Sequence, residues 1–272
     1  MAILSDPAHF FSEYIRISGI AHLGPEKYGN PALLGKTPRE YSLGLLNGSS
    51  WITAWSNYFG RLYLPGVHLV NMGNEAIQLN FMQAHADGKT CPPQANIDRF
   101  IQYAIDLVEL ARVNAVMITC STMNRSYLQV SRALESYNTP VIQIDMPMME
   151  KAVKLGGKVL VIATHGPTVA STQALLSETA DRLGSVIEYD GLVVEQAWLR
   201  LAEGDVLGHN QALGAAIHAA HPVDYSCVVL AQLSMSAFLF SYPDPVSQFG
   251  IPVLTSGQCG FEYAREVLLN LP

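Results

Sequence analysis

The sequence predicts an α/β protein with two pseudo-symmetric lobes, each built from a mostly parallel sheet flanked by helices. Apolar residues make up 49% and charged residues 14% of the 272-residue chain, and short apolar runs alternate with helical patterns, which is typical of a compact α/β protein. The chain also repeats itself. VMITCSTM (116–123) aligns with VVLAQLSM (228–235) at an offset of 112 residues, the difference between 228 and 116, and LGLLNGS (43–49) aligns with LVIATHG (160–166). We expect the active site in the cleft between the lobes, because ligands of open parallel sheets bind beyond the carboxyl ends of the strands.

The first lobe is predicted to comprise residues 41–145 and 256–272. It begins with a βαβ unit, made of the strand and loop YSLGLLNGSS, the helix WITAWSNYFGRL and the strand PGVHLVNM. The next predicted helix, IDRFIQYAIDLVELAR, leads into the strand that ends at Cys120. Its apolar stripe is typical of a helix packed on a sheet and consists of Ile97, Phe100, Ile101, Ala104, Ile105 and Val108.

The second lobe is predicted at 146–255, where the cycle begins again. The successive elements are the strand and loop GKVLVIATHGPT, the helix VASTQALLSETADRLG, the strand SVIEYDGLVV, the helix NQALGAAIHAAH and the strand SCVVLAQLSMS. Residues 1–40 are rich in Gly and Pro and show neither helical nor strand periodicity over a long stretch. We therefore expect an N-terminal extension or flap there.

Composition excludes several classes of partner. The 16 basic and 23 acidic residues give a formal charge of −7, and no block of Lys or Arg could follow a phosphate backbone or an anionic membrane. No uncharged apolar run reaches the length of about 18 residues that spans a bilayer, and the N-terminus has no basic region typical of a signal peptide. We expect a cytoplasmic protein that binds neither nucleic acid nor membrane.

The four cysteines are widely separated and form no CxxC pair, so we read them as free thiols rather than as zinc ligands or a disulfide framework. His218 and His221 have a spacing that could hold a metal, but no third ligand accompanies them and Pro222 follows at a predicted helix end. No metal site is expected.

Four loops follow predicted strands at the carboxyl ends of the sheets, and all are rich in hydroxyl or amide side chains. They are residues 47–50, 120–124, 164–168 and 232–236. Taken one by one, such loops are ordinary strand-to-helix turns capped by Ser, Thr and Asn. Taken as a duplicated set, they favour a site for a small carboxylate. The predicted substrate-binding residues are Asn47, Ser49, Ser50, Ser121, Thr122, Thr164, Thr168, Gln232 and Ser234.

Cys120 is the residue on which the prediction of catalysis depends. A thiol at a helix N-terminus, among backbone donors, is expected to have a lowered pKa and to act as a base or nucleophile. The alternative is a buried structural cysteine, which is equally common at the end of a strand.

The segments TCSTMN, VLVIATHGPT, PVIQIDMPMMEKAV, and VLAQLSMS followed by PVLTS resemble the aspartate/glutamate racemase superfamily. This group includes hydantoin racemases, maleate isomerases and arylmalonate decarboxylases, and the resemblance covers residues 41–272. It implies two lobes with one cysteine from each beside the substrate, one thiol taking the α-proton and the other returning a proton to the opposite face. It also implies that no metal or organic cofactor is needed, and a homodimer is an assembly common among such proteins.

Carried over by position, Cys120 matches the first-lobe cysteine, and Thr122 matches a threonine that contacts the substrate carboxylate. Asn47 stands where many members have an aspartate, and Thr164 with Thr168 matches the second-lobe loop. The departures lie in the second repeat, where the second cysteine and its accompanying histidine are replaced by Gln232 and Ser234.

With no second thiol at its expected position, another acid or base must act, or the reaction must need only one. His165 is the candidate, and its alternative is a turn histidine bonded to backbone. The sequence therefore predicts a cofactor-independent racemase or isomerase that acts on a small carboxylate or cyclic amide through a carbanion-like intermediate, with Cys120 as its cysteine base. A decarboxylase, a cis–trans isomerase and a non-catalytic carboxylate-binding protein remain alternatives.

Overall fold

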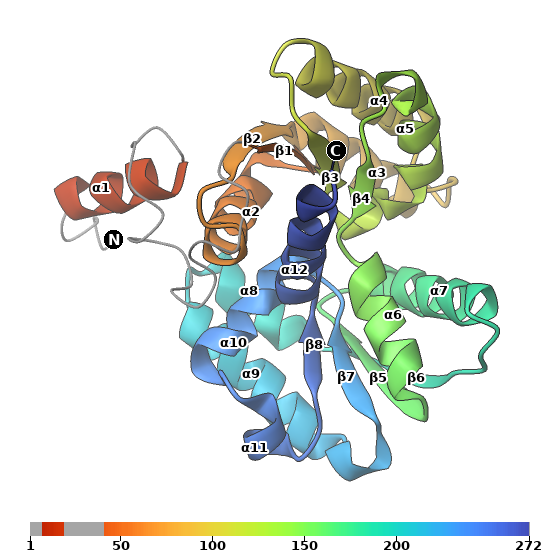
Figure 1. The fold of residues 1–272 in the computed structure, drawn as a ribbon. Coiled ribbons are helices and arrows are strands. Elements are labelled where there is room, and N and C mark those ends of the chain that lie inside the picture. Colours follow the sequence, from red (N-terminus) through yellow and green to blue (C-terminus); the bar gives the residue numbers. More distant parts are fainter. Residues whose placement is uncertain (1–6, 19–40, 272) are drawn as a thin grey trace. The chain divides into compact units, whose positions relative to one another are not determined.

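The computed structural model describes residues 7–18 and 41–271, so most of the predicted N-terminal extension lies outside the described residues. Of that extension, helix α1 (Pro7–Ser18) is described. The chain forms two compact units (Figure 1). The first contains Met1–Ile118, Arg125–Ile142 and Phe261–Pro272, and the second contains Thr119–Asn124 and Gln143–Gly260. In the described ranges, no helix is long and apolar enough to cross a membrane.

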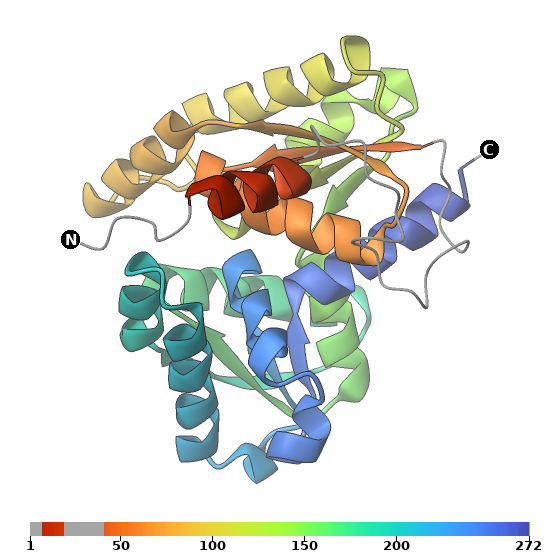
Figure 2. The same cartoon turned by 90° about the vertical axis from the view of Figure 1, so that its left-hand side faces the viewer.

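The first sheet has the strand order β2-β1-β3-β4, and β1 pairs in parallel with both β2 and β3. Figure 2 shows α4 on one face of this sheet and α2 on the opposite face. Strands β1 and β3 are buried, as expected for a sheet covered on both faces. The elements of this half are β1 (Ser42–Asn47), α2 (Ser50–Tyr63), β2 (His68–Gly73), α3 (Glu75–Ala86), α4 (Gln94–Glu109), β3 (Ala115–Ile118), the 3₁₀ helix η3 (Ser121–Ser126), α5 (Tyr127–Ala133), η4 (Glu135–Tyr137) and β4 (Val141–Gln143).

The second sheet repeats the first, with the order β6-β5-β7-β8. Alternate residues of β5 and β7 face two separate apolar cores, one shared with α6 and α7 and the other with α8 to α11. The elements of this half are α6 (Met146–Leu155), β5 (Lys158–Ala163), α7 (Gly166–Arg182), β6 (Glu188–Val193), α8 (Glu195–Ala202), α9 (Val206–Ala219), η5 (Pro222–Asp224), β7 (Cys227–Leu230), η6 (Leu233–Ala237), α10 (Phe238–Ser241), α11 (Pro245–Phe249), β8 (Val253–Thr255) and α12 (Ser256–Leu269). The predicted α/β class with two lobes is confirmed.

The pairing registers correct one part of the predicted repeat. Leu43 of β1 pairs with Ala115, and Val159 of β5 pairs with Cys227. Ala115 and Cys227 are equivalent at the offset of 112 residues, the difference between 227 and 115. Leu43 is therefore equivalent to Val159 and not to Leu160, and LGLLNGS corresponds to VLVIATH. Because side chains alternate between the faces of a strand, this shift of one residue decides which side chains are equivalent.

The helix that follows the last strand of each sheet belongs to the unit of the other sheet. Helix α6 follows β4 but packs against α7 and β7 of the second unit, and α12 follows β8 but enters the first unit at Phe261. The ring of Phe261 lies against α2 of that unit, where a Cβ on Gly60 would meet it at 3.3 Å. Each unit is thus completed by a helix from the other half of the sequence.

The apolar stripe of α4 is rotated from its predicted position. Ile97, Phe100 and Ala104 are buried as expected, whereas the fourth buried apolar residue of α4 is Leu107. The other predicted members, Ile101, Ile105 and Val108, are only half-buried. Leu107 turns inward because Gly44 of β1 has no side chain and leaves room for it.

Candidate active site

The Cys120 loop joins β3 to a 3₁₀ turn. Strand β3 ends at Ile118 and η3 begins at Ser121, so Cys120 lies between a buried strand and a tight helical turn. Only 6% of Cys120 is exposed. Its Sγ lies 3.0 Å from Oγ1 of Thr122, within hydrogen-bond distance, and its carbonyl oxygen accepts a bond from the amide of Met123. The thiol is therefore held by its own loop.

The expected lowering of the thiol pKa is wrong in this structure. Burial raises the pKa of Cys120, and the nearby charge of Asp145 raises it further, while the Thr122 hydroxyl and the amides of Thr122 and Met123 act in the opposite direction. Burial wins because a thiolate loses its hydration in a closed site, and a few donors do not replace it. Cys120 rests as a neutral thiol.

Asp145 is a site residue that the sequence prediction did not single out. It lies two residues after the end of β4 and directly precedes α6, with 3% of its surface exposed. Its Oδ2 accepts a hydrogen bond from Nδ2 of Asn124, and the hydroxyls of Ser121 and Ser256 lie close enough to favour its charge. Burial outweighs these groups and raises the pKa of Asp145 to about 6. An acidic residue at the end of the apolar run that forms β4 was the signal that could have found it.

Asn47 is engaged inside the first unit. Its side chain is fully buried, with Oδ1 accepting from Ser56 Oγ at 2.6 Å and Nδ2 donating to Asn71 Oδ1 at 3.0 Å. Asn71 in turn donates to Asn57 at 2.8 Å. Both ends of the Asn47 amide are used in this chain of amides, which favours a structural role over substrate binding.

The two serines of the same loop differ from each other. Ser49 precedes α2 and is 1% exposed, and its hydroxyl has no hydrogen-bond partner among the described residues. Ser50 donates through both its amide and its hydroxyl to Oε1 of Glu75, the first residue of α3. That contact lowers the pKa of Glu75. The N-terminus of α2 is thus capped by a carboxylate of the protein itself.

In the second unit, Thr164 and Gln232 meet at the ends of neighbouring strands. Oε1 of Gln232 accepts two bonds at 2.8 Å, from the amide and from the hydroxyl of Thr164. These bonds fix the orientation of the side-chain amide, and its Nε2 donates to no described residue. Thr168 and Ser234 are both buried in the same unit. The oriented NH₂ group is suited to bind an acceptor such as a carboxylate oxygen.

His165 precedes α7 and packs edge-on against Trp198 of α8, with ring centroids 5.3 Å apart. Its ring makes no hydrogen bond to the described part of the chain, so the reading as a turn histidine bonded to backbone through its ring is not supported. Burial lowers the pKa of His165, and the charge of Glu195 opposes this only partly. The imidazole is neutral at neutral pH and is therefore chemically a base rather than an acid.

The remaining cysteines differ from Cys120. Cys227 begins β7 and Cys259 lies in α12, and both belong to the apolar core between α6, α7 and the second sheet. Burial raises the pKa of Cys227 to about 11. Cys91 is half-buried, and none of the four cysteines forms a disulfide. Within the described ranges, no group of three or more His, Cys, Asp and Glu side chains could hold a metal ion.

The predicted site residues fall into separate groups. Asn47, Ser49 and Ser50 belong to the first unit, whereas the Cys120 loop, Thr164, His165, Thr168, Gln232 and Ser234 belong to the second. Contacts join Cys120 to Thr122, Ser121 to Asp145, and Thr164 to Gln232.

Comparison with known proteins gives one family. The family model described as Asp/Glu/hydantoin racemase matches residues 74–265. Comparison of the chain with curated proteins gave no match.

Solved structures with a similar fold include three racemases. The aspartate racemase of Picrophilus torridus has 14% identity and a TM-score of 0.60, covering 84% of this chain and 94% of its own. The glutamate racemase of Francisella tularensis subsp. tularensis SCHU S4, in complex with D-glutamate, has 16% identity and a TM-score of 0.58, covering 85% and 82%. The allantoin racemase of Klebsiella pneumoniae has 16% identity and a TM-score of 0.57, covering 85% and 88%. At such identities the likeness shows a shared fold.

Proposed function

This chain belongs to the Asp/Glu/hydantoin racemase family, and from that premise we propose that it is a cofactor-independent racemase or isomerase of a small carboxylate or cyclic amide. The observation that carries the proposal is the position of Cys120, whose thiol lies two residues after a buried parallel strand and has Thr122 Oγ1 3.0 Å from its sulfur. In racemisation, the Cα–H bond of the substrate breaks, its proton passes to the thiolate of Cys120, and its electron pair enters the enolate.

The resting state of Cys120 imposes an order on this reaction. Because burial raises its thiol pKa, Cys120 must lose its proton before it can act as a base. His165 is a neutral base without a hydrogen bond to described residues, so we assign it as the acceptor of the thiol proton. The imidazolium so formed then donates a proton to the opposite face of the enolate, which completes racemisation and restores the neutral imidazole. The amide NH₂ of Gln232, oriented by Thr164, is assigned to the substrate carboxylate or amide oxygen.

A decarboxylase or a cis–trans isomerase is the second candidate, and one observation favours it. Gln232 stands where a second thiol is expected, and Cys120 rests protonated. In decarboxylation, the bond from Cα to the carboxyl carbon breaks, carbon dioxide leaves, and the carbanion takes one proton from the neutral thiol. These steps need only one proton donor. The cytoplasmic location and a homodimer stay predictions.

A substrate screen in deuterated water separates these reactions. Amino acids, hydantoins and substituted malonates are incubated with the protein, and the α-proton signal and optical rotation are followed by NMR and polarimetry. Deuterium entry with loss of optical activity identifies a racemase, and release of carbon dioxide identifies a decarboxylase. Stabilisation of the protein by a compound that undergoes neither change identifies a binding protein and contradicts the proposal.

Cys120→Ala tests the assignment of the thiol. We expect kcat to fall by at least about 10³-fold on any substrate found, because the thiol is the group that moves the proton. Cys91→Ala, at a half-buried thiol outside the site, is the matched control and should keep wild-type kcat. An unchanged kcat in Cys120→Ala rules out catalysis by this thiol.

A further inference from the structure

We propose that Asp145 is a positioning residue for Cys120. Asp145 anchors the loop that carries the thiol, and its negative charge opposes formation of the thiolate. The catalytic meaning of this inference rests on the proposed function, since that function makes Cys120 the reacting thiol. The inference itself concerns only the effect of the Asp145 carboxyl group on the Cys120 thiol.

Three side chains from two segments converge on the Asp145 carboxyl group. Asn124, on the Cys120 loop, donates to Oδ2, and Ser121, on the same loop, lies close enough to favour the charge. Ser256 approaches from the start of α12. Both ends of the turn after Cys120 are therefore tied to one buried group.

When Asp145 is ionised, this cluster of buried polar atoms has one hydrogen-bond donor too few. Oδ1 of Asp145, Oδ1 of Asn124 and Oγ of Ser256 are all buried without a hydrogen-bond partner of good geometry among the described residues. Two of these atoms are acceptors, and the Ser256 hydroxyl can donate only one hydrogen. A proton on Asp145 supplies the second donor. The unpaired acceptors act in the same direction as burial, which raises the pKa of Asp145 to about 6, so that Asp145 is still negatively charged at pH 7.5.

The sequence repeat shows that the fold does not need a carboxylate at this place. At the offset of 112 residues, Asn124 and Asp145 are equivalent to Ser236 and Gly257. There, Oγ of Ser236 accepts a hydrogen bond of 2.9 Å from the amide of Gly257. The second loop is thus tied to its helix without any ionisable group. The carboxyl group occurs only in the half that carries the thiol, which a purely structural role does not explain.

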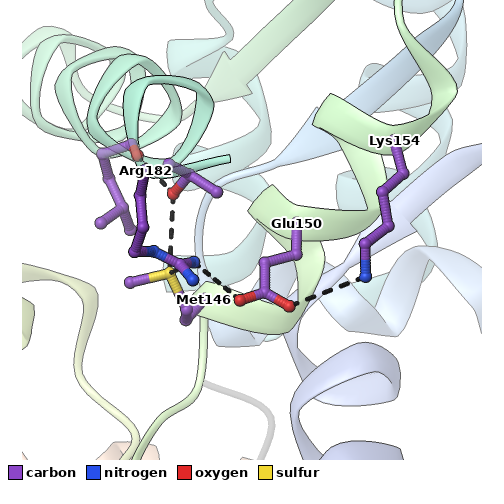
Figure 3. A network of polar contacts seen from close by, with 6 residues as sticks. Met146, Glu150, Lys154 and Arg182 are labelled. Carbon is purple, nitrogen blue, oxygen red and sulfur yellow. Dashed lines mark hydrogen bonds and ion pairs between the residues drawn. The ribbon is translucent and has the colours of Figure 1, made fainter. Parts of the chain in front are cut away.

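The neighbouring contacts hold Asp145 in place. Figure 3 shows Arg182 of α7 between Met146 and Glu150 of α6, with Nη2 3.2 Å from Met146 Sδ and 2.7 Å from Glu150 Oε1. Met146 directly follows Asp145. On the other side, a Cβ on Gly260 would meet the carbonyl oxygen of Ile144 at 2.7 Å, so α12 approaches the backbone next to Asp145 closely. The chain on both sides of Asp145 is therefore packed against neighbouring helices, α7 on one side and α12 on the other.

No other charge is found to set the pKa of Asp145. Burial and the side chains of Asn124, Ser121 and Ser256 account for it. Several titratable groups lie on the Cys120 loop or on elements that pack against α6 or contribute to the cluster: Arg125 after the loop, Glu150, Lys151 and Lys154 on α6, Glu178, Asp181 and Arg182 on α7, Cys227 on β7, and Cys259, Glu262, Tyr263, Arg265 and Glu266 on α12. Cys120 is the group whose pKa responds to Asp145.

The test measures Cys120 directly. Alkylation by iodoacetamide is followed for each cysteine by mass spectrometry between pH 6 and 10, in the wild type and in Asp145→Asn. We expect Cys120 to react at least about threefold faster at pH 7.5 in the variant, because an opposing charge has been removed from a site of low dielectric constant. Ser236→Ala is the matched control, since it breaks the equivalent contact of the second half without changing a charge, and its Cys120 profile should match the wild type.

An unchanged or slower Cys120 profile in Asp145→Asn overturns the inference. If that variant does not fold, the wild type supplies the answer. The ¹³Cβ resonance of Cys120 in cysteine-labelled protein, assigned with Cys120→Ser, should shift with an inflection near pH 6, and no inflection between pH 5 and 7 is the contrary result. Neither measurement needs a substrate, so each can fail while the proposed activity holds, and can succeed while that activity fails.

Discussion

The buried carboxyl group of Asp145 makes the stability of this protein depend on pH. Its pKa is about 6 when folded and 3.8 ordinarily, so the folded protein holds a proton that the unfolded chain has released between these values. The free energy of unfolding therefore falls as the pH rises through this window. We expect the wild type to lose on the order of 2 kcal/mol relative to Asp145→Asn between pH 4.5 and 7, measured by urea denaturation at both pH values. An equal difference between the two proteins at both pH values contradicts the assigned pKa.

The sequence predicted the position of Cys120 at the end of a strand but not the charges and burial around its thiol. The apolar run before Cys120 predicted a strand end, and the structure has that strand end at Ile118. The direction of the thiol pKa was predicted wrongly because burial depends on distant segments. Ser256 lies more than 100 positions along the chain from Asp145, and no local sequence pattern predicts that their side chains lie close together.

Among the helices, α12 tolerates no side chain at the point where it passes the β4–α6 junction. Gly260→Ala would place a Cβ 2.7 Å from a backbone oxygen, which cannot yield as a flexible side chain does. We expect a loss of about 1–3 kcal/mol in the free energy of unfolding, measured by urea denaturation. The control is Gly166→Ala at the start of α7, where nothing lies within 4 Å, and it should stay within about 0.5 kcal/mol of the wild type. Equal stability of the two variants contradicts the close packing of α12.

Elements with a strong apolar pattern were predictable, and those on the surface were not. The predicted strands of both βαβ units are present, as are α2, α4, α7 and α9. Sequence periodicity gave no expectation for α3, in which only Ile77 and Ala84 are buried, or for α8, in which only Ala197 is buried. Helices that bury so little have no apolar stripe to detect. The predicted bounds of the lobes place α6 in the second lobe and α12 in the first, although no local periodicity shows which side chains they contact there.

For the molecule as a whole, the repeat predicts what a second thiol would do. Gln232 is equivalent to Cys120, so Gln232→Cys places a thiol at the matching position of the second repeat. We expect racemisation to appear or to rise relative to the native reaction, measured by loss of optical activity in deuterated water. The variant also removes the acceptor of Thr164, so its fold is checked by thermal denaturation.

His165→Asn is the companion variant for this prediction. If it alone removes activity and Gln232→Cys adds none, then His165 is the second acid or base and Gln232 is an amide that binds substrate. If neither change affects a substrate that is turned over, a symmetric two-base mechanism does not apply to this protein.

The strand registers also record how the two halves have diverged since duplication. From β1 to β2 the paired positions are Ser42 and His68, and from β5 to β6 they are Lys158 and Glu188, so the second crossover has gained four residues or the first has lost them. Between the third and fourth strands the halves keep the same length, since Val116 bonds to Pro140 and Val228 bonds to Pro252. Insertions and deletions have accumulated elsewhere, but not in the connection that carries Cys120 or Gln232. The two copies therefore differ here by the identity of their residues and not by the length of the connection, so a single replacement restores the cysteine at position 232 without any change of chain length.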